Sequence, residues 1–273
     1  MRTSTEWLRY FESNARQLLD IPWDHGPELT DAEVTAVGPS IAEFQRGESG
    51  EGRHLIQYAR AYGEHTGDGD YVPAVVLFIR EEQRHARDLR RVLELHHIAL
   101  ARASFADAVF RRLRNVFGSL EVSIAVLITA ELMAQVYYEA LRQATGSTIL
   151  RRLCEQILND EARHVEFQAE RLGMVRARHG AMRYLVTMSL QRSLFAGTSV
   201  VVWLVHRHAL RRGGYPFSRF WTEAWRCFAE AFAISAAVKQ IARDPDYHSE
   251  RCASSSADPS SLRSSGREPL RSH

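Results

Sequence analysis

Two short stretches with nearly the same residues decide the fold of this chain. Residues 81–85 read Glu-Glu-Gln-Arg-His, and residues 160–164 read Asp-Glu-Ala-Arg-His. Residues three apart on a helix lie on the same face, so each stretch presents one carboxylate together with one imidazole. A single Glu-x-x-His pair is common on solvent-facing helices. Its repetition on two predicted helices indicates that both pairs contribute to one site.

The residues around each stretch predict that both pairs face a core. Apolar residues recur at helical spacing before and after Glu82 and His85, and the same holds for Glu161 and His164. Charged groups in an apolar stripe are costly unless they are paired or bind a metal ion. The alternative is a set of buried salt bridges with the arginine of each stretch. It would require arginine to enter the same core, and the matching spacing would then be a coincidence.

Helical periodicity covers most of the chain, and strand signals are nearly absent. We expect helices at about 3–19, 30–64, 71–95, 120–143, 149–176, 181–210 and 218–242, with a break at Gly38-Pro39 as an option for the second. Short turns make neighbouring helices antiparallel, and a longer link through Phe110 returns the chain alongside the first hairpin. The sequence therefore predicts an all-α protein built on an antiparallel four-helix bundle with one crossover.

This pattern divides the chain into four parts. Residues 1–29 form an N-terminal helix and linker, residues 30–176 the bundle, and residues 177–246 a helical extension. Residues 247–273 are rich in serine, proline and arginine without a hydrophobic pattern. We expect that tail to be disordered.

A site for two metal ions also needs one carboxylate from each remaining bundle helix. Glu131 lies among apolar residues of the helix at 120–143, and the helix at 30–64 offers Glu48 and Glu51. Glu131 and Glu161 are 30 residues apart around one turn, and Glu51 and Glu82 are 31 apart around the other, whereas Glu48 is 34 from Glu82. Ligands of one site should lie at the same height along the bundle. The spacing therefore favours Glu51, and Glu48 remains the alternate.

The predicted set is rich in oxygen ligands, which suit iron or manganese. The predicted metal ligands are Glu51, Glu82, His85, Glu131, Glu161 and His164, with Glu48 as the alternate for Glu51. Over residues 40–175 the chain resembles the ferritin-like diiron-carboxylate superfamily, whose pattern is a Glu from each of two helices and Glu-x-x-His from the other two. The resemblance implies two iron ions, or one manganese and one iron, bridged by Glu82 and Glu161. It makes Glu51 and Glu131 terminal ligands and gives each metal one histidine.

The acid before each ligand glutamate sharpens the resemblance. The acid-Glu-x-Arg-His form is similar to that of bacterial diiron monooxygenases and of the small subunits of ribonucleotide reductases. By that resemblance Asp160 would hydrogen-bond His85 and Glu81 would hydrogen-bond His164, which fixes the tautomer and basicity of each ligand. Solvent-facing acids are the alternative, because helix geometry sets Glu81 and Asp160 about 100° from the adjacent glutamates.

The resemblance implies a non-haem diiron, or manganese–iron, oxidoreductase that activates O2 to oxidise a small organic molecule. The sequence does not identify the substrate. No flavin or NAD motif occurs, so electrons are expected from a separate donor protein. A rubrerythrin-like protein that reduces peroxide or O2 is the alternative. Iron oxidation and storage of the ferritin type is disfavoured, because two Glu-x-x-His pairs indicate a retained cofactor.

The composition limits the kinds of binding partner and the cellular compartment that we expect for this protein. The 273 residues carry a formal charge of +2, which gives no electrostatic case for nucleic acid. Three widely spaced cysteines and an N-terminus without an apolar stretch favour the cytoplasm. The apolar segment 193–205 has thirteen residues, fewer than the roughly 20 that span a bilayer. We expect that segment to be buried in a core or interface, expect no membrane association, and leave a homodimer open.

Overall fold

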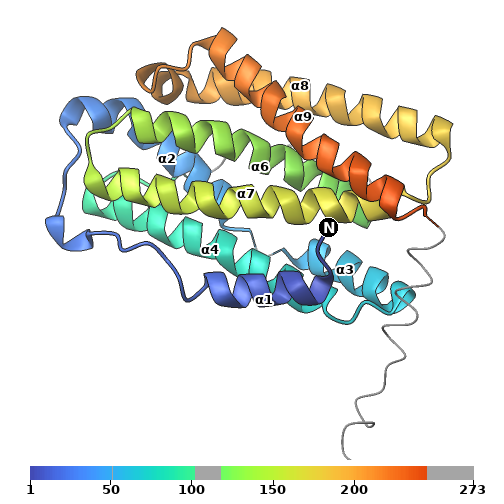
Figure 1. Ribbon diagram of the computed structural model, residues 1–273. Coiled ribbons are helices and arrows are strands. Elements are labelled where there is room, and N and C mark those ends of the chain that lie inside the picture. Colours follow the sequence, from blue (N-terminus) through green and yellow to red (C-terminus); the bar gives the residue numbers. More distant parts are fainter. Residues whose placement is uncertain (51, 102–117, 245–273) are drawn as a thin grey trace, which may run out of the picture.

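The computed structural model describes residues 1–50, 52–101 and 118–244, and every regular element in these ranges is a helix (Figure 1). The helices are α1 (Ser4–Asn14), a short 3-10 helix (Trp23–His25), α2 (Asp31–Glu48), α3 (Arg53–Thr66), α4 (Tyr71–Leu95), α6 (Leu120–Gln143), α7 (Thr148–Arg176), α8 (Ala181–Arg212) and α9 (Phe217–Ile241). The all-α prediction is therefore confirmed for this part of the chain. The predicted tail at 247–273 lies outside the described residues, as does most of the link that precedes α6.

Side-chain caps explain where several helices begin. Thr30 and Glu33 form a reciprocal capping box at the start of α2. Ser119 accepts a hydrogen bond from the Val122 amide at the start of α6, and Ser147 does the same at the start of α7. Each cap satisfies an amide that the first helical turn leaves without a partner. These local signals set where α2, α6 and α7 begin, and all three helices supply residues to the site described below.

The break in the helix predicted at 30–64 does not lie at Gly38-Pro39. Helix α2 runs through Pro39 and ends at Glu48, and α3 begins at Arg53 after Gly52 in a left-handed conformation (φ +62°). Proline removes one backbone donor, but its fixed φ is close to the helical value. Glycine tolerates a positive φ without steric cost, so the glycine-rich stretch after Glu48 is where the helix ends.

Three layers of helices place the site in the middle of the molecule (Figure 1). Helices α6 and α7 pack extensively against each other, and α4 packs against α7, α2 and α3. Helix α1 covers α4 from outside, whereas α8 and α9 cover α6 and α7 from the opposite side. The central space between α2, α4, α6 and α7 is thus shielded by helices on both sides.

Large apolar side chains fill this central space. Phe78 and Leu89 of α4, Tyr137 of α6 and Leu153 of α7 are all buried, and Trp7 joins them from α1. Burying one side chain of this size contributes about 1.5–3 kcal/mol to stability. The polar groups described below therefore lie inside a true hydrophobic core.

Helix α8 departs from the expectation of burial. Among the described residues, α6 and α8 are the two helices long and apolar enough to cross a membrane by length and composition. In the most apolar stretch of α6, 72% of the residues are buried, against 22% in α8. Phe195 and Val202 pack inward, but Val200, Leu204 and Val205 are exposed. Residues 193–205 are therefore buried on one side of α8 and exposed on the other, because a segment apolar all round does not reveal which side packs. Burial of the exposed side in an interface stays a prediction.

Candidate metal centre

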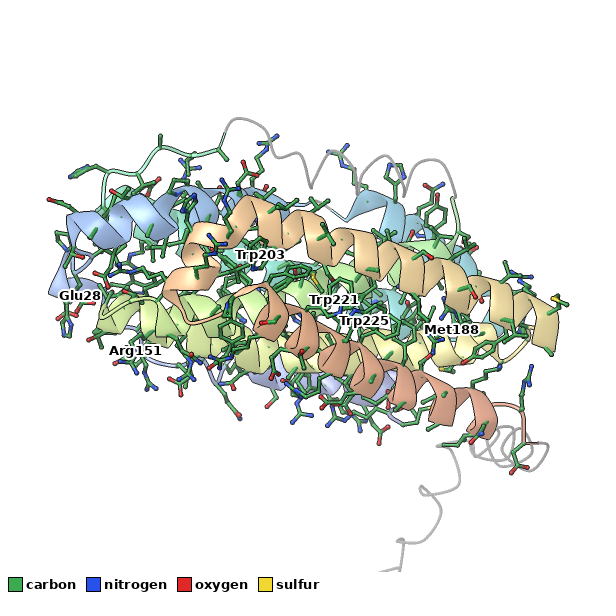
Figure 2. The ribbon with its side chains drawn as sticks, turned by 90° about the horizontal axis from the view of Figure 1, so that it is seen from above. Glu28, Arg151, Met188, Trp203, Trp221 and Trp225 are labelled. Atoms are coloured by element: carbon green, nitrogen blue, oxygen red, sulfur yellow. The ribbon has the colours of Figure 1, made fainter. Side chains whose placement is uncertain are left out.

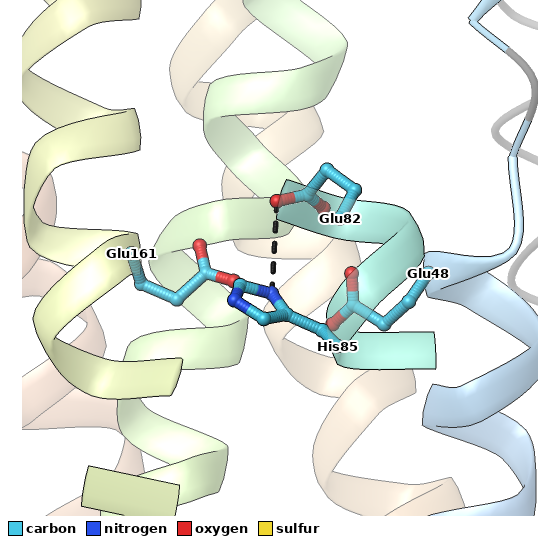
Figure 3. Close-up of side chains that lie close together, drawn as sticks. All are labelled: Glu48, Glu82, His85 and Glu161. Carbon is cyan, nitrogen blue, oxygen red and sulfur yellow. Dashed lines mark ion pairs between the residues drawn. The ribbon is translucent and has the colours of Figure 1, made fainter. Parts of the chain in front are cut away.

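One buried cluster gathers carboxylates and imidazoles from four helices. Two overlapping groups each bring four ligand atoms within 4.8 Å of one another. The first group is Glu48, Glu82, His85 and Glu161, shown in Figure 3, and the second is Glu82, Glu131, Glu161 and His164. Glu82 and Glu161 belong to both groups. Each group then adds one further glutamate and one histidine, so the cluster has the layout of two adjacent cation sites with two shared carboxylates.

Regular helix geometry brings these side chains together. Glu82 and His85 lie one turn apart on α4, and Glu161 and His164 lie one turn apart on α7. Glu131 comes from the middle of α6, buried at 4% exposure. The structure thus brings together five of the six side chains predicted as metal ligands.

The sixth position concerns Glu48 and Glu51. Glu51 lies outside the described residues, whereas the alternate Glu48 is the last residue of α2 and belongs to the cluster. Tyr138 donates a hydrogen bond to Glu48 Oε1 at 2.8 Å. The spacing argument that favoured Glu51 assumed one continuous helix, but α2 ends at Glu48. A break in the helix removes the fixed rise per residue on which that argument depended.

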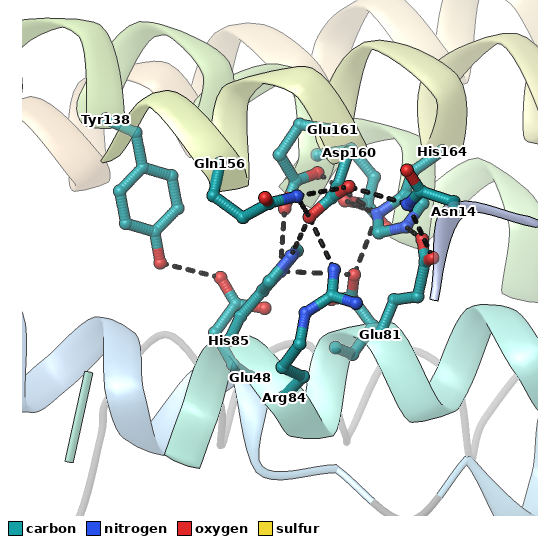
Figure 4. Close-up of polar contacts among 12 residues, drawn as sticks. Asn14, Glu48, Glu81, Arg84, His85, Tyr138, Gln156, Asp160, Glu161 and His164 are labelled. Atoms are coloured by element: carbon teal, nitrogen blue, oxygen red, sulfur yellow. Dashed lines mark hydrogen bonds and ion pairs between the residues drawn. The ribbon is translucent and has the colours of Figure 1, made fainter. Parts of the chain in front are cut away.

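The outer nitrogen of each histidine meets an acid from the opposite helix. His85 Nε2 lies 3.0 Å from Asp160 Oδ2, and His164 Nε2 lies 2.9 Å from Glu81 Oε2 (Figure 4). A carboxylate accepts but does not donate when ionised, so these contacts place the imidazole proton on Nε2. In the neutral imidazole the lone pair is then on Nδ1, the atom that can bind a cation.

Both Nδ1 atoms point into the cluster. His85 Nδ1 lies 3.6 Å from Glu161 Oε1, and His164 Nδ1 lies 2.8 Å from Glu82 Oε1. Apart from these contacts with one another, neither Nδ1 atom, nor Glu82 Oε1, nor either carboxylate oxygen of Glu161 has a hydrogen-bond partner among the described residues. Buried polar atoms seldom lack partners in folded proteins. The five atoms therefore fit the coordination of cations.

The electrostatics of the cluster agree with this fit. Burial, followed by repulsion from Glu131 and Glu82, raises the pKa of Glu161 well above its usual value. Burial and the Glu82 charge raise the pKa of Glu48 in the same way. Burial alone would lower the pKa of His164, but Glu82, Glu161 and Glu81 raise it well above its usual value. Without cations, the cluster can relieve this repulsion only by retaining protons.

A network behind the histidines was not found from the sequence. Asn14 Nδ2 donates to Glu81 Oε1 at 2.7 Å and to Asp160 Oδ1 at 2.8 Å, so one amide from the end of α1 joins the two acids (Figure 4). Arg84 Nη2 donates to Asp160 Oδ2 at 2.6 Å, and Gln156 Nε2 donates to the same carboxylate. Asn14 has no fixed spacing from any ligand. No periodicity could therefore have identified it.

These donors hold Asp160 in its ionised form. Burial alone would raise the pKa of Asp160, but hydrogen bonds from His85 and Asn14 and the charge of Arg84 hold it well below its usual range. An ionised Asp160 keeps the proton of His85 on Nε2.

In the described part of the chain, salt bridges with the arginines of the two stretches do not involve the glutamates at the centre of the cluster. Arg84 pairs with Asp160, and Arg163 pairs with Glu166 at 2.8 Å near the surface. Neither arginine pairs there with Glu82 or Glu161. The carboxylates at the centre of the cluster therefore have no arginine to balance them.

Comparisons of the chain with protein-family models, curated proteins and solved structures give no match. The described residues thus form a helical protein with a buried glutamate–histidine cluster that could hold metal ions.

Proposed function

We propose that this chain is a ferritin-like four-helix-bundle protein that binds two iron ions, or one manganese and one iron, and uses them to oxidise a small organic molecule with O2. The observation that carries the proposal is the pair of overlapping ligand groups that share Glu82 and Glu161. A single structural metal would need only one such group. Carboxylates suit manganese, imidazoles suit iron, and the cluster offers no thiolate for the metals that prefer sulfur.

Each residue has a definite part in this proposal. His85 and His164 would each hold one metal through Nδ1, while Asp160 and Glu81 accept the Nε2 protons. Glu82 and Glu161 would offset the charge of both cations, since they belong to both ligand groups. When bound, the metals would supply electron transfer to O2. The electrons would come from a separate donor protein.

The surroundings of the cluster suit oxidation chemistry. The ring of Phe78 packs edge-on against His164 with 4.8 Å between centroids, and Phe11 lies on the same side. These rings exclude water from one side of the site. Glu48 and Glu82 are only partly buried on the side where α2 ends. That side is where we place the entry of O2 and substrate.

The proposal is tested by loading the metal-free protein with Fe(II) under anaerobic conditions and then mixing it with O2. We expect O2 to be consumed in proportion to bound iron, a new absorption in the near ultraviolet, and iron that stays with the protein at two ions per chain. Parallel runs with hydrogen peroxide measure the rubrerythrin-like alternative.

Three results would contradict the proposal. Bound iron that reacts with neither oxidant would leave only a structural role. A far faster reaction with peroxide than with O2 would favour a scavenger. Continued iron uptake beyond two ions per chain would favour storage.

A further inference from the structure

The outward side of α8 is an apolar strip with no cover among the described residues. Met182, Leu185 and Leu190 are 75%, 61% and 65% exposed. At about 100° per residue, the side chains at positions 182, 186, 190, 193, 197, 200 and 204 fall within an arc of about 80°. We call these seven residues the α8 strip. It extends over about 33 Å of helix and contains no charged side chain.

The other side of α8 is held firmly by the protein. Phe195, Val202 and His206 are buried, and α8 packs against α6, α2 and α9. Figure 2 looks onto α8 and α9, with Trp203, Trp221 and Trp225 between the two helices. The α8 strip therefore lies on a helix that is held in place by packing against three other helices. Exposed apolar surface of this extent on a soluble protein usually marks an interaction site.

The charged side chains of α8 itself have one sign. Helix α8 contains no aspartate or glutamate, and its five arginines are at positions 183, 192, 207, 211 and 212. All five are exposed. Arg183 lies 3.6 Å from Glu121 and Arg212 lies 3.8 Å from Glu33. Within the described ranges, no carboxylate lies at ion-pair distance from the other three arginines; Arg207 donates to a backbone carbonyl and Arg211 lies over the Trp203 ring. The occupant that complements this face is apolar and carries negative charge at its edges.

A second copy of the chain fits this face less well. Two α8 helices packed antiparallel around Ser193 and Gly197 would set Arg207 level with the partner subunit's Arg183. Two helices packed in parallel would set each arginine beside its counterpart. Either arrangement brings like charges together on a helix without acids, and Glu121 of α6 lies beside Arg183 but not beside Arg207.

We propose that the α8 strip docks onto the surface of an anionic lipid bilayer, with α8 lying in the membrane plane. Apolar side chains of the strip enter the acyl region, and arginines beside and beyond the strip meet lipid phosphates. Arg207 and Arg211 lie on the outward side at the C-terminal end of α8, where they would meet the lipid phosphates. This surface is distinct from the metal cluster, and the inference does not depend on metal binding.

Vesicle flotation of the full-length protein tests the proposal. The vesicles are phosphatidylcholine alone, or phosphatidylcholine mixed with phosphatidylglycerol, each at low and high salt. We expect the protein to float with anionic vesicles, less with neutral ones, and less at high salt. Leu190→Glu and Leu204→Glu should each reduce the bound fraction by about tenfold or more, the effect of withdrawing one large apolar side chain from lipid. Both positions are exposed, so neither change should disturb folding.

A matched control and a second measurement keep the outcome clear. Leu18→Glu alters a side chain of similar exposure (43%) at the α1 end of the molecule, and it should float as the unaltered protein does. Light scattering after size exclusion reports the oligomeric state. The proposal is overturned if the protein binds no vesicles. It is equally overturned if Leu190→Glu converts a dimer to a monomer without changing vesicle binding, because the strip would then belong to a second copy.

Discussion

The buried glutamate–histidine cluster and the outward side of α8 depart in opposite directions from the usual distribution of charged and apolar side chains. Inside the protein, Glu161 and His164 are almost fully buried, yet ligand atoms of both lack partners among the described residues. Outside, Leu185 and Leu190 are exposed and apolar. Proteins usually bury apolar groups and pair or expose charged ones. By our proposals, each exception has a partner from outside the chain: cations for the cluster and lipid for α8.

The largest effect is expected from Glu161→Gln, which keeps the shape of the side chain but removes its charge. The variant should bind fewer than two metals per chain, because Glu161 belongs to both ligand groups. In the metal-free state it should be more stable than the unaltered protein by about 1–3 kcal/mol, because a buried carboxyl with a raised pKa destabilises the folded protein at neutral pH and the amide does not. Metal analysis and urea unfolding measure the two effects.

Glu155→Gln is the matched control on the same helix. Glu155 is half exposed and pairs with Arg152 at 2.8 Å. Its removal should change neither metal content nor stability by a measurable amount. A Glu161→Gln protein that still holds two metals would remove Glu161 from the ligand set.

A smaller effect is expected from Asn14→Ala. Losing the amide that joins Glu81 and Asp160 should weaken metal binding by about 10- to 100-fold, the usual range for residues that orient metal ligands. Competition with a coloured chelator measures the affinity directly, and Gln17→Ala on the exposed surface nearby is the control. Unchanged affinity in the Asn14 variant would mean that the two acids position the histidines without it.

Glu33 sharpens the comparison as a buried acid whose oxygens do have partners. It accepts hydrogen bonds from the Thr30 and Gly146 amides. Burial alone would raise the pKa of Glu33, but these hydrogen bonds and one from the Thr30 hydroxyl lower it to about 2. A lowered pKa in the folded state stabilises the protein above the unfolded value near 4.5, and this contribution is lost as pH falls toward 2.

Glu33→Gln should therefore destabilise the protein by about 1–3 kcal/mol at neutral pH. The difference between the two proteins should shrink as pH falls from 4.5 toward 2, which urea unfolding across that range will show. The sign is opposite to that expected for metal-free Glu161→Gln. Equal signs for the two changes would contradict the distinction between satisfied and unsatisfied buried acids.

The smallest effect is expected from Leu190→Glu on folding stability. An exposed apolar side chain contributes little to folding, so the free energy of unfolding in detergent-free buffer should change by less than about 0.5 kcal/mol. Leu153→Ala, in contrast, removes a fully buried side chain and should cost about 2–5 kcal/mol. A large loss of stability in Leu190→Glu would show that the strip is already covered in the folded protein.

The sequence predicts regular elements and the repeated pairs well, because both depend on local spacing. The bounds predicted for the helices at 71–95 and 120–143 are those of α4 and α6, and the Glu-x-x-His repeat identifies α4 and α7 as the helices that carry the histidines. The break considered at Gly38-Pro39 was misplaced: the helix ends after Glu48, since Pro39 is tolerated inside α2.

Two features required the structure because they depend on tertiary packing. Asn14 meets Glu81 and Asp160 from helices far apart in sequence, and no pattern in the chain links them. The exposure of α8 depends on which side packs against α6, and an all-apolar segment does not encode that choice.

The central claim is that the cluster around Glu82 and Glu161 holds two cations, and metal content tests it most directly. The metal-free protein is loaded with Fe(II) or Mn(II) without oxygen, dialysed, and measured by mass spectrometry of the metals against protein concentration. We predict two tightly held ions per chain and fewer than two in Glu161→Gln. A folded protein that retains none, or that binds the same number after this change, would contradict the account.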